Sequence, residues 1–129
     1  KAAPEIISHN METVRRITPQ VRSAAKYDIS LSVLARIAKQ GITAKTGIMV
    51  GLGETINEVH TLMDDVLAAG VSVLTIGQYL QPSRKNIPVT EYVTPEQFES
   101  YKSIALQKGF KMVESAPLVR SSYHAEKHV

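Results

Sequence analysis

The strongest constraint on the fold is a repeated alternation of short apolar runs with longer amphipathic segments. Each apolar run has the length of a strand, and each amphipathic segment repeats its apolar residues at helical spacing. Strands are predicted at 4–10, 43–53, 71–80 and 111–119, and helices at 29–41, 54–70 and 94–109. Such alternation is typical of a parallel sheet joined by right-handed helical crossovers. We therefore predict an α/β protein of four alternating β-α units.

Local signals mark the ends of two helices. Thr55, followed three residues later by Glu58, forms a capping-box pattern, and Gly70 is typical of the position just past a helix end. Thr94 followed by Gln97 predicts a second helix start.

Predictions also follow for residues 11–17 and for the burial of residues 71–80. Residues 11–17 are predicted to form one or two helical turns before Thr18 and Pro19 interrupt them. Residues 71–80 are almost continuously apolar, as expected for a strand that is covered on both faces.

The four units fit either a small open sheet or half of a barrel whose other half lies elsewhere. The start at Lys1, without a methionine, favours the half barrel. Both architectures bind ligands at the carboxyl ends of their strands. The positions of interest are therefore 9–10, 51–54, 78–79 and the tail beyond Val119.

Composition excludes several classes of protein. The 129 residues are 43% hydrophobic, enough for one domain with a core, and the formal charge is only +3 with acids and bases interspersed. This argues against a nucleic-acid arm or a polybasic membrane patch. No apolar run approaches the roughly 18 residues of a membrane span. Without cysteine the chain forms no disulfide and no thiolate metal site of its own.

Glycines after a predicted strand, in residues 47–54, form the first candidate site. They allow a close backbone approach to a ligand, although an ordinary turn explains them equally well. Glu54 stands where an anion would bind, so a flat ring such as adenine fits better than a phosphate. Gln78, within an apolar run, either faces a ligand or is a hydrogen-bonded core amide.

The polar tail is the other candidate. Ser121 and Ser122 lack the flanking glycines of a nucleophile elbow, and Arg120 suits an anion better than a base. His124 and His128 have the spacing of one helix face, but without a third ligand a solvated tail explains them better than zinc.

Four motifs, in order along the chain, resemble the lipoyl synthase family. They are SHNMET at 8–13, KTGIMVGLGET at 45–55, TIGQYLQPS at 75–83 and RSSYHA at 120–125. The resemblance implies a radical S-adenosylmethionine (SAM) enzyme built on a partial (β/α) TIM barrel. Such an enzyme inserts two sulfur atoms into an octanoyl chain carried by a lipoyl-carrier protein. It uses SAM and two [4Fe-4S] clusters, one to make a radical and one as the sulfur source.

The resemblance also implies roles for a set of residues. One motif matches the radical-enzyme pattern G-x-I-x-G-x-x-E, with methionine in place of isoleucine, and packs near the adenine of SAM. The remaining cofactor-binding residues lie at two other strand ends. The implied cofactor-binding set is Asn10, Glu12, Gly47, Met49, Gly51, Glu54, Gln78 and Tyr79.

In the tail, the resemblance implies a metal-binding serine. Ser121 is assigned as the fourth ligand of the sulfur-donating cluster, with Ser122 as the alternative. Arg120 is assigned a catalytic role beside that cluster.

The family's cysteine triads are missing from this chain. The resemblance therefore implies the carboxyl-terminal portion of a barrel domain, residues 1–129 with a tail at 120–129, that is inactive alone and prone to self-association. The family implies a cytoplasmic or organelle-matrix location. The alternative is a small α/β module that binds a nucleotide, or only dimerises, without catalysis.

Overall fold

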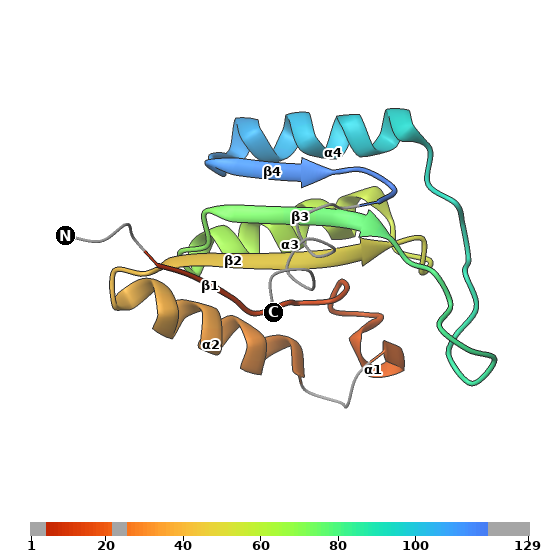
Figure 1. The fold of residues 1–129 in the computed structure, drawn as a ribbon, viewed down its shortest axis with the longest axis horizontal. Helices are drawn as coiled ribbons and strands as arrows, with labels where there is room; N and C mark the ends of the chain where they lie inside the picture. Colours follow the sequence, from red (N-terminus) through yellow and green to blue (C-terminus); the bar gives the residue numbers. More distant parts are fainter. Residues whose placement is uncertain (1–4, 22–25, 119–129) are drawn as a thin grey trace.

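A computed structural model describes residues 5–21 and 26–118. Neighbouring strands are parallel, and the sheet has the order β1-β2-β3-β4 (Figure 1). The elements are β1 (Ile6–Ser8), α1 (Thr18–Val21), α2 (Lys26–Lys39), β2 (Thr43–Val50), α3 (Ile56–Ala68), β3 (Val73–Gln78), α4 (Pro95–Lys108) and β4 (Met112–Ser115). The predicted alternation is confirmed.

The sequential strand order decides between the two architectures. Right-handed crossovers between strands that follow one another place every helix on the same side of the sheet. Figure 1 shows this arrangement, with α3 behind β2 and β3, α2 beside β1, and α4 beside β4. A doubly wound sheet would instead reverse its order and carry helices on both faces. The described part of the chain is thus a segment of a (β/α) barrel, with a helical outer face and a concave inner face.

Burial follows the two faces of the sheet. Val50 of β2 and Leu74 and Ile76 of β3 are fully buried beneath the helices. Val73 and Thr75, which alternate with them, are only half-buried on the concave face. The expectation that residues 71–80 are covered on both faces is wrong for the described residues, because the helices pack against only one of the two faces.

The helix caps form as predicted. The Thr55 side chain accepts from the Glu58 N–H, and the Glu58 carboxylate accepts from the Thr55 N–H, completing the capping box of α3. Thr94 accepts from the Gln97 N–H at the start of α4.

The segment after β1 differs from the prediction. Residues 15–17 form a turn, and α1 begins at Thr18, where an interruption was expected. The Thr18 hydroxyl donates to the carbonyl of Val14, and Pro19 occupies the first turn of the helix. Proline is tolerated there because its missing N–H would have no helical acceptor. Across residues 5–21 and 26–118, no helix is long and apolar enough to cross a membrane.

Candidate functional site

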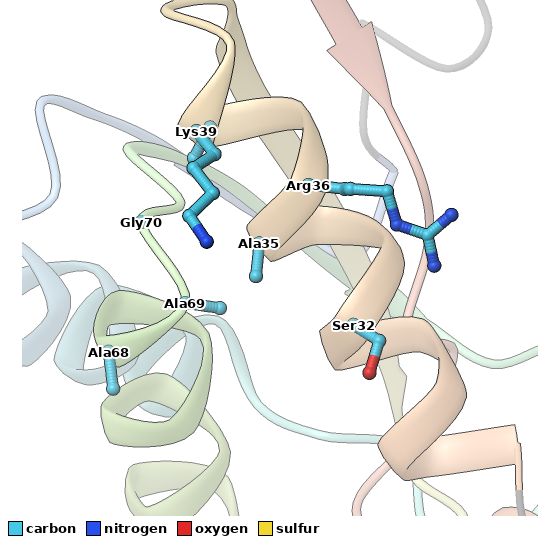
Figure 2. A pocket seen from close by; sticks show the side chains of 8 residues that line it. Ser32, Ala35, Arg36, Lys39, Ala68, Ala69 and Gly70 are labelled. Atoms are coloured by element: carbon cyan, nitrogen blue, oxygen red, sulfur yellow. The ribbon is translucent and has the colours of Figure 1, made fainter.

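A hollow of about 510 Å³ lies between α2 and the end of α3, at the amino-terminal ends of the strands (Figure 2). Half of its lining residues are alanine, and Lys39 extends into it while Arg36 points away. A Cβ atom at Gly70 would lie 2.6 Å from the Ala38 Cβ, so close helix packing accounts for the small residues. Ligands of barrel folds bind at the opposite end of the strands. We therefore look for the site there.

A row of residues crosses the concave face near the carboxyl ends of the strands. Gly47 of β2 is the register partner of Thr75, which in turn is the partner of Glu114. A Cβ atom at Gly47 would lie 2.6 Å from Thr75 Oγ1 and 3.1 Å from Asn10 Oδ1. The missing side chain of Gly47 thus lets the Asn10 amide and the Thr75 hydroxyl approach from either side.

Sequence reasoning missed part of this face. A hollow of about 160 Å³ beside the row is lined by Lys45, Thr75, Met112 and Glu114, among others. A period of two predicts which residues of one strand share a face, but it does not align strands with one another. Thr75, a polar residue within the apolar run at 71–80, was the sequence feature that could have indicated this polar face.

The segment that contains Asn10 and Glu12 is fastened to β2. The Met11 N–H donates to the buried Thr46 hydroxyl, which donates to the carbonyl of His9. The Met49 N–H donates to the carbonyl of Glu12 at 2.8 Å. Glu12 has a φ of 75°, the only positive φ among the described residues other than glycine. Strained backbone of this kind clusters at functional sites.

The turn after β2 uses Glu54 internally. Its carboxylate accepts from the N–H groups of Gly51 and Leu52, both at 2.9 Å. Gly51 and Gly53 have φ of 99° and 104°, which favours glycine at both positions. The carboxylate thus occupies the place where these N–H groups would otherwise bind an anion such as phosphate. With both oxygens engaged, Glu54 shapes the turn at the carboxyl end of β2.

Gln78 and Tyr79 hold the loop that follows β3. The Gln78 amide donates to the carbonyls of Tyr79 and Glu91 and accepts from the Val93 N–H. The Gln78 amide is hydrogen-bonded but only half-buried, so it is not a core amide, and that it faces a ligand stays a prediction. The Tyr79 side chain is buried, and its hydroxyl donates to the carbonyl of Ile87 at 2.7 Å.

Arg16 joins the segment after β1 to the turn after β2. Its guanidinium donates to both oxygens of Glu58, at 2.7 and 2.9 Å, and to the carbonyl of Gly53 at 2.9 Å. The hydrogen bond from Arg16, helped by that from the Thr55 backbone, lowers the pKa of Glu58 to about 2. The segment after β1 is thereby clipped to the turn after β2 and to the start of α3.

A second polar cluster lies on the outer surface near α2 and α3. A hollow of about 340 Å³ is bordered there by Arg15, Tyr27 and Asp65, among others. The Tyr27 hydroxyl donates to Asp65 at 2.8 Å, and the Arg15 guanidinium lies over the Tyr27 ring. Burial, followed by the bond to Asp65, raises the pKa of Tyr27 well above its ordinary value. These groups satisfy one another, so the cluster is explained as packing.

The tail assignments cannot be placed on this geometry. Arg120, Ser121, Ser122 and both tail histidines lie outside the described residues. Within the described ranges, no group of three or more His, Cys, Asp or Glu side chains could hold a metal ion.

A sequential parallel sheet, helices on one face and a concave face that includes Gly47 define a segment of a (β/α) barrel, as in the radical SAM fold. Comparison with known proteins narrows the class. The chain is 83% identical over 99% of its length to a lipoyl synthase of Parabacteroides distasonis, and 68% identical over all of it to one of Bacteroides thetaiotaomicron. A lipoyl synthase of Treponema denticola is 64% identical over the whole chain.

The chain belongs to the lipoyl synthase family, as its motifs suggested. It spans 46%, 46% and 44% of the length of these three relatives, corresponding to the carboxyl-terminal half of such an enzyme. No protein-family model matches the chain. Nothing found favours the alternative of a small noncatalytic module.

Proposed function

We propose that this chain forms one wall of the reaction chamber of a lipoyl synthase. The whole enzyme would be a sulfurtransferase that inserts two sulfur atoms into an octanoyl chain on a lipoyl-carrier protein. The observation that supports this most directly is the concave row around Gly47, in a chain 83% identical to a lipoyl synthase. Residues 1–129 would be the carboxyl-terminal portion of one barrel domain, including the tail at 120–129.

The residues at the carboxyl ends of the strands fit SAM. Gly47 lets two hydrogen-bonding side chains, Asn10 and Thr75, come together over the strand, while Met49 would offer an apolar contact two residues along the same face. Gly51 would contribute indirectly: an added Cβ would overlap Gln78 Nε2 and the Glu91 carbonyl oxygen, so glycine here lets the loop after β3 pack against the turn. When bound, SAM supplies the hydrogen-abstracting radical.

The remaining residues of the implied set would act on this pocket in two ways. Glu12 would present its carboxylate from the strained segment beside Asn10. Glu54, Gln78 and Tyr79 would position the two loops at the pocket's edge through the hydrogen bonds that they already make.

The two [4Fe-4S] clusters do not fit this chain alone, which has no cysteine. We propose that their thiolate ligands come from the remainder of the enzyme. From this chain Ser121, or alternatively Ser122, would serve as an oxygen ligand, with Arg120 beside it. The isolated chain would then be inactive.

Gly47→Ala in the full-length enzyme tests the pocket. The new methyl group would displace Thr75 or Asn10, because its Cβ would lie 2.6 and 3.1 Å from their oxygens. We expect SAM to bind about tenfold more weakly, equivalent to about 1.4 kcal/mol. Equilibrium binding of SAM to the reconstituted enzyme, followed by a lipoyl product assay, measures this.

Gly41→Ala is the matched control. Unlike Gly47, Gly41 has a positive φ, 81°, and an added Cβ there would meet no atom within 4 Å; Gly41 lies just before the start of β2. This variant should lose about 1 kcal/mol of stability without losing affinity for SAM. Wild-type affinity in Gly47→Ala would contradict the proposed pocket.

A further inference from the structure

The loop between β3 and α4, residues 79–94, extends beyond the carboxyl ends of the strands (Figure 1). It is anchored at both ends. Besides the bonds of Gln78 and Tyr79, the carbonyl of Gly51 accepts from the N–H groups of Thr90 and Glu91, at 2.8 and 3.2 Å. A loop so fixed presents the same surface whether or not a partner is bound.

The tip of the loop is stabilised by its own polar residues. Ser83 Oγ lies 2.9 Å from Asn86 Oδ1, and the Gln81 amide donates to the carbonyl of Asn86 at 2.8 Å. Arg84 and Lys85 lie within this turn. Among the residues that the structure describes, neither cationic side chain has a hydrogen bond or an ion pair, whereas Arg16 and Lys108 do. The turn therefore exposes two cations that its own fold does not use.

Two large apolar side chains are exposed on the two arms of the same loop. Leu80, where the loop leaves β3, is 61% exposed, and Tyr92, where it returns towards α4, is 70% exposed. A loop that exposes aromatic and aliphatic side chains as well as unpaired cations is typical of protein-binding surfaces, where aromatic residues and charge complementarity give affinity and orientation.

We propose that Leu80, Arg84, Lys85 and Tyr92, hereafter the loop platform, bind an acidic surface of the octanoylated carrier protein. The inference rests on the proposed function. The platform adjoins the end of the barrel where the substrate must enter, so a carrier seated on it could deliver its acyl-lysine to the concave face. Unpaired cations select an acidic partner, and the apolar anchors favour a folded protein over a free acyl group.

Reversing the charges of Arg84 and Lys85 tests carrier binding separately from the sulfur-insertion reaction. In the full-length enzyme, Arg84→Glu with Lys85→Glu should raise the KM for the octanoylated carrier protein about tenfold at low salt, because charge steers association. The kcat should stay close to wild type. A short peptide with one octanoyl-lysine should be converted with unchanged kcat/KM. Raising the salt to about 0.5 M should largely remove the difference, because exposed charges are screened.

Arg36→Glu with Lys39→Glu is the matched control. It changes the net charge by the same amount at the amino-terminal ends of the strands. Its KM for the carrier should stay at the wild-type value. The loop platform is refuted if the two double variants behave alike, if the Arg84/Lys85 variant keeps the wild-type KM, or if it loses peptide turnover equally.

The proposed function has its own readout in the same experiment. A wild-type enzyme that forms no lipoyl product from either substrate would overturn both that function and the docking proposal. A wild-type enzyme active on both substrates, with no change on charge reversal, would overturn the docking proposal alone.

Discussion

At Glu12 the backbone has a φ of 75°, in the left-handed region that costs a residue with a side chain about 1–2 kcal/mol. Hydrogen bonds on both sides hold it there, from the Glu12 N–H to the carbonyl of Gly47 and from the Met49 N–H to that of Glu12. Glycine would adopt this conformation without strain. The presence of glutamate instead suggests that its carboxylate has a use that outweighs the strain.

Glu12→Gly should therefore leave the free energy of unfolding within about 1 kcal/mol of wild type, because relief of strain offsets the greater freedom of the unfolded chain. In the full-length enzyme, the same change should lower SAM affinity or product formation. Thermal unfolding and SAM binding measure the two effects separately.

Glu12→Val completes the comparison at this residue. A β-branched side chain at positive φ should destabilise the protein as well as impair the site. If Glu12→Gly binds SAM and forms product at wild-type levels, the carboxylate has no role in the site.

At the scale of elements, the Arg16–Glu58 pair connects the segment after β1 to the start of α3. Its strength depends on pH because Glu58 has a depressed pKa, about 2 against an ordinary 4.5. A carboxyl whose pKa falls on folding contributes stability above its unfolded pKa, and that stability is lost as the pH falls through the folded value.

Glu58→Gln should consequently cost about 1 kcal/mol at neutral pH, after allowance for solvent screening of this partly exposed pair. The difference from wild type should shrink between about pH 4.5 and pH 2. Urea unfolding of both proteins across this range measures it. Glutamine can still accept from the Thr55 N–H, so the comparison isolates the charge. A difference that is independent of pH would contradict this account.

Helix starts were predictable because capping is local. Thr55 with Glu58 and Thr94 with Gln97 interact over three residues, and both contacts occur as expected. The start of α1 was not predictable, because it depends on the burial of Thr18 by the rest of the fold. Gln78 was only partly predictable. Its polarity within an apolar run is visible in the sequence, but its hydrogen-bond partners, Glu91 and Val93, lie across a loop whose path no local pattern predicts.

At the scale of the molecule, β1 is an edge of the described sheet, with Ile6 58% and Ile7 40% exposed. An unpaired apolar edge strand is a template for pairing with another chain. We expect the isolated chain to self-associate in sedimentation experiments, and Ile6→Lys to reduce that association because a charged edge opposes strand pairing.

Ile29→Lys is the control for this prediction. Ile29 is 51% exposed but lies on α2, away from the sheet edge. It should leave self-association unchanged. A wild-type chain that remains monomeric at high concentration would contradict the prediction.

The sequence by itself determined the alternation of strands and helices, the caps at Thr55 and Thr94, and the motifs of the lipoyl synthase family. These depend on contacts within a few residues or on the order of letters. Only the tertiary structure decided the strand order, the meeting of Asn10, Gly47 and Thr75, and the positive φ of Glu12. Those features depend on register between distant strands, which is set by packing the helices on one face and not by any local preference.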